Sequence, residues 1–262
     1  MRFLLFFLLV SLLGFSQNKS SISEYECNYI IKFQKDTLNS TLINEEILSL
    51  LISENISLSK STQKVIYDSL VSAEFDKSIH EAKGGRPIID LSRIPTVKFK
   101  QEVYKNGDNL TGFNELLKTV YEYPITDKIK WNIKGETKEI QKYLCRKAVG
   151  YYNNREYVAW YAPKIPISEG PHVFKGLPGL IFEVYDTKNL YSFKLVGLKK
   201  VSKPIVLPIS QIKTDYPKFA RARMNFLKDP NGVFESQSRF KIPQKDRERL
   251  ENMHKSNNNF ID

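Results

Sequence analysis

The chain has 262 residues, of which 41% are hydrophobic, and a formal net charge of +11 at pH 7. This length allows one large β domain or two small ones, and we expect one. The charge favours contact with anionic surfaces, but the lysines are scattered among acidic residues, so no dedicated nucleic-acid surface is expected. The two cysteines and three histidines form no recognisable metal-ligand pattern, and we expect no metal and no cofactor.

Residues 1–16 have the pattern of a secretory signal peptide. Arg2 precedes a run of Phe, Leu and Val, and Gly14-Phe15-Ser16 supplies a small-residue cleavage site. The apolar run is too short to cross a bilayer, and no other stretch is apolar enough for a membrane helix. We therefore expect a protein that does not span the membrane and is exported to the periplasm, the cell surface or the medium.

The first expected strand covers residues 24–33, where apolar and polar residues alternate with period two. The alternation places Cys27 on the core face. Cys145 lies in a later expected strand, so Cys27 and Cys145 could pair in an oxidising compartment or remain two separate buried thiols. Their spacing leaves both alternatives open.

Residues 44–61 favour two strands joined near Glu54-Asn55, and residues 63–77 have the spacing of a short amphipathic helix. The sequence Lys83-Gly84-Gly85-Arg86-Pro87 predicts a mobile loop. A strand over residues 97–103 is expected to end at a turn, Lys105-Asn106-Gly107-Asp108.

Further strands are expected at residues 119–123 and 128–133, separated by Pro124. A turn at residues 134–136 should lead into a long run over residues 137–152. Asn153-Asn154 predicts a type I′ hairpin into residues 155–161, and Thr187-Lys188-Asn189 predicts another between residues 180–186 and 190–198. Consecutive hairpins without helices between them favour an antiparallel meander.

Prolines and glycines punctuate the segment from Trp160 to Tyr185, which excludes a helix there. Within it, Leu177-Pro178-Gly179-Leu180 predicts a type II turn with a positive φ at Gly179. We treat Gly176, Pro178 and Gly179 as the structural turn residues.

The C-terminal part predicts two helical segments. Residues 218–228 favour a basic helix, and residues 241–262 form a charged tail with a short helix and a loose end. We therefore divide the mature chain into a single antiparallel β domain, residues 17–240, and a C-terminal tail, residues 241–262.

The standard catalytic signatures are missing from the sequence. His80-Glu81-Ala82-Lys83-Gly84 begins like a zinc-protease helix but has Gly84 where a second histidine is required. His172 is the most interesting titratable residue because it lies in the rigid segment. It could act with Glu169 or Asp186 in a hydrolase of unfamiliar type, although an isolated histidine is more often structural.

The same segment carries a resemblance to a known family. Its motifs are Ala159-Trp160-Tyr161, Ile165-Pro166-Ile167, Gly170-Pro171, Phe174 and Gly176-Leu177-Pro178-Gly179-Leu180-Ile181. With these motifs the chain resembles the GLPGLI family, which is named for the hexapeptide. Lys142 and Asn154 replace two glycines that the family shows nearby, and residues 258–262 are similar to its usual ending. The resemblance implies an exported protein of Bacteroidetes bacteria with no assigned reaction.

We expect a mainly β protein, either a curved antiparallel sheet or an incomplete β-barrel, with one or two covering helices. The leading hypothesis is a non-catalytic protein that binds an apolar or peptide-like ligand on the concave face, or docks onto an outer-membrane or envelope partner. The candidate binding residues are Arg155, Trp160, Tyr161, His172 and Phe174. The alternatives are the hydrolase using His172 and a structural role in envelope assembly. A deep apolar cavity under the Pro/Gly segment would favour a carrier, whereas a filled core would favour docking.

Overall fold

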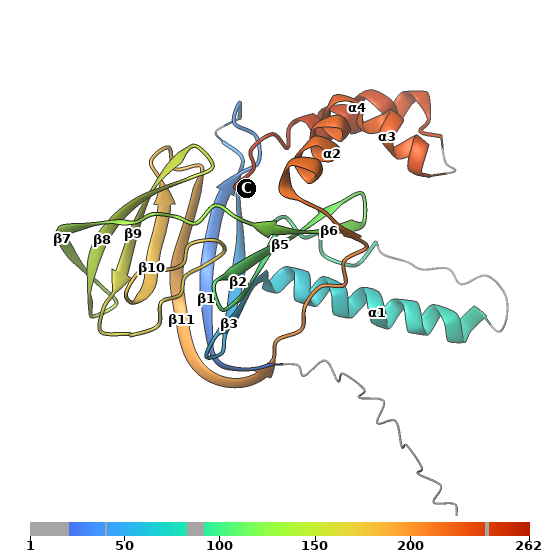
Figure 1. The fold of residues 1–262 in the computed structure, drawn as a ribbon. Coiled ribbons are helices and arrows are strands. Elements are labelled where there is room, and N and C mark those ends of the chain that lie inside the picture. The colour runs from blue at the N-terminus through green and yellow to red at the C-terminus, as the bar shows by residue number, and fades with distance from the viewer. Residues whose placement is uncertain (1–20, 40, 83–91, 239–240) are drawn as a thin grey trace, which may run out of the picture.

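The computed structural model describes residues 21–39, 41–82, 92–238 and 241–262 (Figure 1). The predicted signal peptide and the loop expected at residues 83–87 lie outside these ranges. All the strands described belong to one twelve-stranded sheet that is not closed into a barrel. The prediction of a mainly β protein with an open, curved sheet is therefore confirmed.

The order of the strands in the sheet is β12-β6-β5-β4-β3-β2-β1-β11-β10-β9-β8-β7. Their bounds are β1 (Ile22–Gln34), β2 (Ile43–Ile52), β3 (Ile56–Ser61), β4 (Glu102–Asn106), β5 (Asn109–Leu116), β6 (Thr119–Ile125), β7 (Asn132–Ile140), β8 (Tyr143–Tyr152), β9 (Arg155–Ala162), β10 (Leu180–Asp186), β11 (Tyr191–Pro204) and β12 (Ile212–Lys213). Neighbouring strands run antiparallel except β12 and β6, which are parallel. The long pairing of β1 with β11 joins the two halves of the sheet, although about 160 residues separate these strands along the chain.

Four helices are described: α1 (Thr62–Ala82), α2 (Tyr216–Lys228), α3 (Pro230–Gln237) and α4 (Gln244–Lys255). Figure 1 shows α1 projecting from one side of the sheet, and α2, α3 and α4 gathered near one end. The predicted helices at residues 63–77 and 218–228 are present, whereas α3 was not predicted. Asp215 begins α2 because its carboxylate accepts a hydrogen bond from Lys218 N, and Pro217 suits the first turn.

Two-residue turns with positive φ connect three of the hairpins. Asn153 and Asn154 have φ values of 45° and 57°, as the type I′ prediction requires. The turn between β7 and β8 lies at Gln141 and Lys142, with φ of 51° and 68°, and not at residues 134–136 as predicted. Residues 134–136 instead form an irregularity in the β7–β8 pairing between Ile133 and Thr137. Gln-Lys carries no turn signal in the sequence, so the prediction placed the turn at the nearby glycine.

Two other predicted boundaries are wrong. Residues 97–101 are not a strand, and β4 begins at Glu102. Pro124 lies within β6 instead of ending it, because β12 pairs with β6 only at Tyr121 and Glu122. The missing N–H of Pro124 therefore falls where β12 does not pair with β6.

The end of the chain is packed, and the predicted loose end is wrong. Ile261 is fully buried, and Asp262 is only 6% exposed. The carboxylate of Asp262 accepts hydrogen bonds from Gln101, Asn114, Tyr123 and Arg223. Burying a carboxylate is costly unless donors surround it, so these contacts fix the last residues against the sheet.

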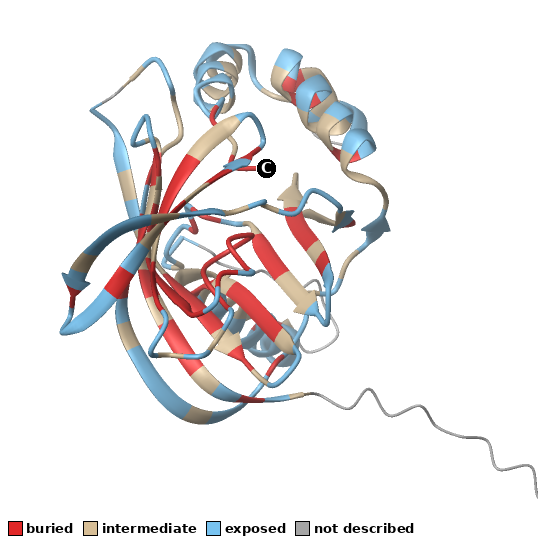
Figure 2. Cartoon of the chain, turned by 60° about the vertical axis from the view of Figure 1, so that its left-hand side comes forward, coloured by how far each residue is buried: buried red, intermediate tan, exposed pale blue. Residues whose placement is uncertain are grey.

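Figure 2 shows the buried residues concentrated on the strands, whereas the helices are mostly exposed. The core lies on the inner face of the curved sheet. Its largest fully buried side chains include Tyr29, Tyr157, Phe174 and Phe193. Phe174 packs against the rings of Tyr157, at 4.7 Å between centroids, and Phe193, at 5.5 Å. Because Phe174 comes from the loop between β9 and β10, this loop supplies part of the core that the strands enclose.

Candidate functional site

Residues 163–179, here called the connector, cover the inner face of the sheet. Val173, Phe174 and Leu177 are 3% exposed or less. Polar contacts join the connector to the middle strands of the other half of the sheet, where Ser57 Oγ of β3 donates to Glu169 Oε2 at 3.0 Å. The concave face is therefore filled by the chain itself, and neither of the two cavities described below is lined by the connector.

Two lysines neutralise the buried carboxylate of Glu169. Lys175 Nζ lies 2.8 Å from Glu169 Oε2, and Lys105 Nζ lies 2.7 Å from Glu169 Oε1. Burial would raise the pKa of Glu169, but the two lysines outweigh burial and hold that pKa below its usual value. Lys175 Nζ also donates to Gly170 O at 2.6 Å. The two buried charges of the connector, Glu169 and Lys175, are thus paired inside the fold.

The turn at the end of the connector needs glycine at position 179. Gly179 has a φ of 145°, and a Cβ at this position would lie 2.3 Å from Ala162 O. Gly179 N donates to Leu177 O, and Leu180 N donates to Ile165 O instead of closing the turn at Leu177. These hydrogen bonds differ from those of the predicted type II turn, because β10 begins by pairing with the connector.

His172 is a buried core residue that is 2% exposed. Its backbone N donates to Ser59 Oγ at 2.9 Å, and its ring lies edge-on to Phe99 with 5.7 Å between centroids. Burial lowers the pKa of His172 to about 3, so the ring is neutral at physiological pH. The φ of 52° is unusual for a residue other than glycine.

The proposed partners of His172 are engaged elsewhere. Glu169 is held by the two lysines, and Asp186 Oδ1 accepts a hydrogen bond from Tyr191 N at 2.8 Å. Neither of the two cavities described below is lined by His172, Glu169 or Asp186. The geometry therefore does not support the hydrolase alternative.

The other candidate binding residues do not come together. Trp160 and Tyr161 are neighbours in β9, so they point to opposite faces of the sheet. Tyr161 and Phe174 are buried in the core, whereas Trp160 lies on the other face with Lys138 Nζ 4.6 Å from its ring centroid. Arg155 donates to Asn259 Oδ1 at 2.5 Å and thereby holds the end of the chain.

Cys27 and Cys145 are free and buried. They lie on β1 and β8, and β11, β10 and β9 stand between these strands in the sheet. A disulfide requires Cα atoms within about 7 Å. Of the two alternatives left open by the sequence, the structure contains the separate thiols. Burial raises the pKa of Cys27 to about 12 and that of Cys145 to about 11, which keeps both thiols protonated.

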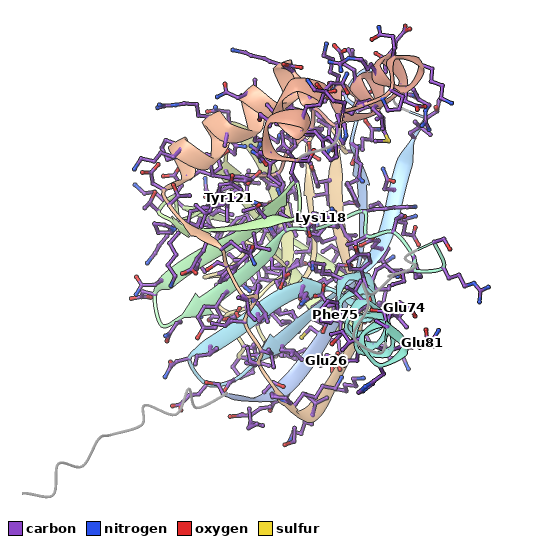
Figure 3. The ribbon with its side chains drawn as sticks, turned by 90° about the vertical axis from the view of Figure 1, so that its right-hand side faces the viewer. Glu26, Glu74, Phe75, Glu81, Lys118 and Tyr121 are labelled. Carbon is purple, nitrogen blue, oxygen red and sulfur yellow. The ribbon has the colours of Figure 1, made fainter. Side chains whose placement is uncertain are left out.

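The structure contains a cleft of about 370 Å³ that the sequence did not predict. Its lining comes from α2, from the end of α4 and the residues after it, from the β5–β6 turn, and from two segments near residues 35 and 98–101. We call it the basic cleft because its lining contains the cations Lys35, Lys98, Lys100, Lys118 and Arg223 but only one carboxylate, that of Glu115. Figure 3 shows Lys118 below the C-terminal helices, on the side of the molecule that also carries α1.

Three of the five cations in the basic cleft make no ion pair with any residue that the structure describes. Lys100 pairs with Glu115 at 2.8 Å, and Arg223 pairs with Asp262 at 2.7 Å. Within the described part of the chain, no carboxylate lies within 4.0 Å of the amino groups of Lys35, Lys98 or Lys118.

Lys35 is the most buried of these three lysines. Burial lowers the pKa of its amino group, and the positive charges of Lys100 and Lys98 lower it further, whereas Glu46 opposes them. The carboxylate of Glu46 raises this pKa more than either lysine alone lowers it, and it also accepts hydrogen bonds from Lys98 N, Phe99 N and Ser61 Oγ. Around this partly desolvated position, the lining of the cleft holds five cations and the single carboxylate of Glu115.

Aromatic rings form the other part of the lining. Phe33 packs against Phe99 at 5.5 Å and against Tyr191 at 6.0 Å between centroids. The guanidinium of Arg223 lies 3.9 Å from the ring centroid of Phe260. Packed rings beside these cations give the cleft a surface that is partly apolar and partly charged.

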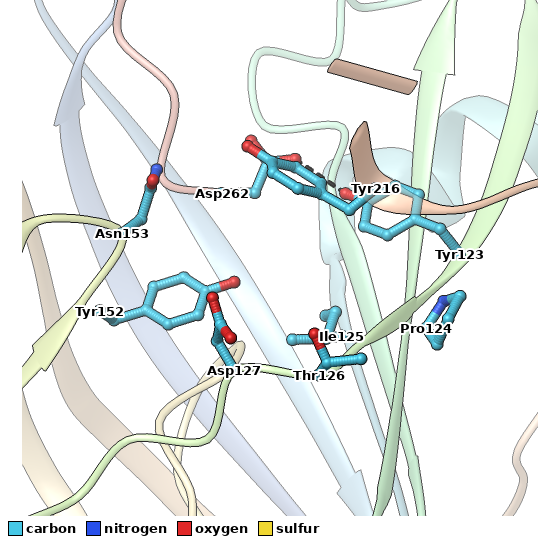
Figure 4. Close-up of a pocket in the computed structure, with 9 residues that line it drawn as sticks. All are labelled: Tyr123, Pro124, Ile125, Thr126, Asp127, Tyr152, Asn153, Tyr216 and Asp262. Atoms are coloured by element: carbon cyan, nitrogen blue, oxygen red, sulfur yellow. Dashed lines mark hydrogen bonds between the residues drawn. The ribbon is translucent and has the colours of Figure 1, made fainter. Parts of the chain in front are cut away.

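A smaller cavity of about 50 Å³ lies beside Asp262 and is lined by Tyr123, Asp127, Tyr152 and Tyr216, among others. Figure 4 shows the hydrogen bond from Tyr123 to Asp262 at its edge. This volume is enough for a few waters and too small for an organic ligand. The basic cleft is therefore the candidate functional site.

The residues of the basic cleft were missed because no local pattern unites them. Lys35, Lys98, Lys118 and Arg223 come from four distant parts of the chain. The only signals in the sequence were the excess of basic residues and the basic helix at residues 218–228.

Comparisons with known proteins add a family match and a distant structural similarity. A family described as "Protein of unknown function (Porph_ging)" matches residues 151–183, which include all of β9 and the connector. Two structures of PNGF-II, in space groups P21 and C2, are similar with a TM-score of 0.47 each and sequence identities of 16% and 15%. Each similarity covers 76% of this chain but only 32% of PNGF-II, so the chain spans about a third of that protein. No curated protein matches.

None of the helices in the described ranges is long and apolar enough to cross a membrane.

Proposed function

We propose that this protein is exported through residues 1–16 and acts by non-catalytic binding, with the basic cleft as the surface on which a cell-envelope partner docks. The observation that carries this proposal is that the concave face is filled by the connector, whereas the basic cleft is open and has unpaired cations. The complete hexapeptide at residues 176–181 supports membership of the GLPGLI family as part of the same proposal.

A ligand on the concave face would have to displace the connector. That displacement would expose Phe174 and Leu177 and break the ion pairs of Glu169. Exposing two large apolar side chains costs several kcal/mol, at about 1.5–3 kcal/mol each. A carrier function at this face is therefore unfavourable, and docking elsewhere is favoured.

The basic cleft meets the requirements of a docking site. Its volume of about 370 Å³ lies within the range of binding pockets and suits one or two side chains of a partner better than a large ligand. Its rings and cations resemble the residue types that contribute most binding energy at protein interfaces. The unpaired lysines lose no internal ion pair when a partner binds.

Site-specific photo-crosslinking in the native host would test this proposal. Benzoylphenylalanine would replace Lys118 in the basic cleft and, as the matched control, the exposed Lys164 of the connector. We expect an envelope adduct from position 118 and none from position 164, and the adduct should disappear with Lys98→Glu. Equal adducts from both positions, or none from either, would reject docking at the cleft. Fractionation of cells with and without residues 1–16 tests export separately.

A further inference from the structure

We infer that the basic cleft takes an acidic peptide segment in which a large apolar or aromatic side chain lies next to a carboxylate. This inference rests on the proposed docking function and names the chemistry of the partner. Nothing in the fold outside the cleft is needed for it.

The charge of the cleft selects for an anion. Among the described residues, Lys35, Lys98 and Lys118 make no ion pair, and the partly desolvated Lys35 feels the charge of Glu46 as well as those of Lys100 and Lys98. Placing like charges close together in a region of reduced dielectric is unfavourable, and a carboxylate bound among them would relieve the repulsion. The cleft should therefore bind an anionic partner more tightly than a neutral one.

The rings of the cleft select for an apolar neighbour of that carboxylate. Phe33 and Phe99 are nearly buried and pack together, so their surface facing the cleft is fixed. Phe260 is held under Arg223. An aromatic or large aliphatic side chain would exclude water from the partly exposed Phe260 and Leu117 of the lining, which strengthens the contact between the neighbouring carboxylate and the lysines.

A peptide fits these features better than a lipid. The lysines come from three separate segments around the cleft, so no side of it is wholly apolar as an acyl chain requires. Amide groups at Gln101 and Asn257 also line the cleft, and amides match the donors and acceptors of a peptide backbone.

The test uses two labelled peptides and the protein comprising residues 17–262. One peptide alternates aspartate with phenylalanine over five residues, and the other has asparagine in place of each aspartate. Fluorescence anisotropy should show the acidic peptide binding about ten-fold more tightly or better, since each ten-fold step equals about 1.4 kcal/mol, the scale of one favourable charge pair. The preference should decrease as salt is added.

A matched pair of variants locates the binding. Lys98→Gln with Lys118→Gln should weaken the acidic peptide by about ten-fold or more. Lys188→Gln with Lys200→Gln removes the same net charge at exposed positions outside the cleft and should leave the affinity unchanged. Equal losses in both double variants would show a nonspecific charge effect and overturn the inference.

Other outcomes separate this inference from the proposed function. If both peptides bind equally, or only phosphatidylglycerol vesicles bind and Lys98→Gln with Lys118→Gln abolishes that binding, the acidic-peptide inference is wrong. If neither peptide binds while the crosslink from position 118 persists, the inference is also wrong but the docking function stands. If neither peptide binds and no crosslink forms, both are rejected.

Discussion

The connector and the basic cleft both place lysines beside buried aromatic rings, yet they use these lysines differently. In the connector, Lys105 and Lys175 neutralise one buried carboxylate. In the cleft, Lys98 and Lys118 have no counterion among the described residues. Paired charges inside a fold hold its parts in register, whereas unpaired charges at a cleft remain available to a partner. The most distinctive sequence motif is therefore structural, and the candidate binding surface lies elsewhere.

The largest expected effect comes from breaking the ion pairs of the connector. Glu169→Gln leaves the buried Lys175 without its counterion and should lower the free energy of unfolding by about 3–5 kcal/mol. Chemical denaturation checks this value. The double variant Glu169→Gln with Lys175→Met serves as the control, because it removes both charges, and it should regain part of the loss. A single variant as stable as the parent would show that the charges of the connector do not hold the fold.

Replacing glycine in the turn tests how closely the end of the connector packs against the strand before it. Gly179→Ala places a Cβ against Ala162 O and should cost about 3 kcal/mol, since the backbone must move. Gly176→Ala is the matched control, because its φ is also positive but nothing lies within 4 Å of the added Cβ. It should cost only about 1 kcal/mol, the price of the backbone conformation. Thermal unfolding of both variants would measure the difference, and equal costs would contradict the close contact.

Because the pKa of His172 is lowered in the fold, we expect acid to lower the stability of the protein. Its pKa falls from about 6.5 in the unfolded chain to about 3 in the fold, so the folded protein binds fewer protons between these values. Stability is therefore complete above pH 6.5 and is lost as the pH falls towards 3, by about 3 kcal/mol at pH 4.5.

Replacing His172 with a neutral residue tests this prediction. His172→Asn keeps a side chain that tolerates a positive φ but does not titrate, so it should remove that part of the pH dependence. Urea titrations at pH 7 and pH 4.5 compare the two proteins. If the variant loses as much stability between pH 7 and pH 4.5 as the parent does, other groups cause the acid sensitivity.

The smallest expected effect on stability belongs to the basic cleft. Lys98→Gln and Lys118→Gln should each change the free energy of unfolding by less than about 0.5 kcal/mol, since neither lysine makes an ion pair within the described fold. Urea denaturation measures this value. A loss comparable to that of Glu169→Gln would mean that the cleft lysines also hold the fold and would remove the contrast between the two regions.

The sequence predicted much of the sheet because its strands are marked locally. Alternation identified β1, and Asn153-Asn154 identified the β8–β9 hairpin. The turn at Gln141-Lys142 was missed because its positive φ values are imposed by strand pairing and not by residues that favour them. The packed end was missed for a similar reason, since a short polar segment becomes ordered only through donors that come from β5, β6 and α2.

The candidate site was harder to predict than the fold. Candidate binding residues were chosen for being aromatic and close together in the sequence, and the alternation of β9 separated Trp160 from Tyr161. The basic cleft depends on where β1, the segment before β4, the β5–β6 turn and α2 meet in space. A local sequence pattern does not show which distant segments come together in space. The excess of positive charge was therefore the only sequence signal of the cleft.

The irregularity of β7 at residues 134–136 has a consequence for solubility. β7 is the last strand at one end of the sheet, so the backbone groups on its outer side are free to pair with a strand of another molecule. A distorted strand with lysines at positions 134 and 138 presents a poor template for such pairing. The irregularity and these lysines therefore disfavour edge-to-edge pairing along β7.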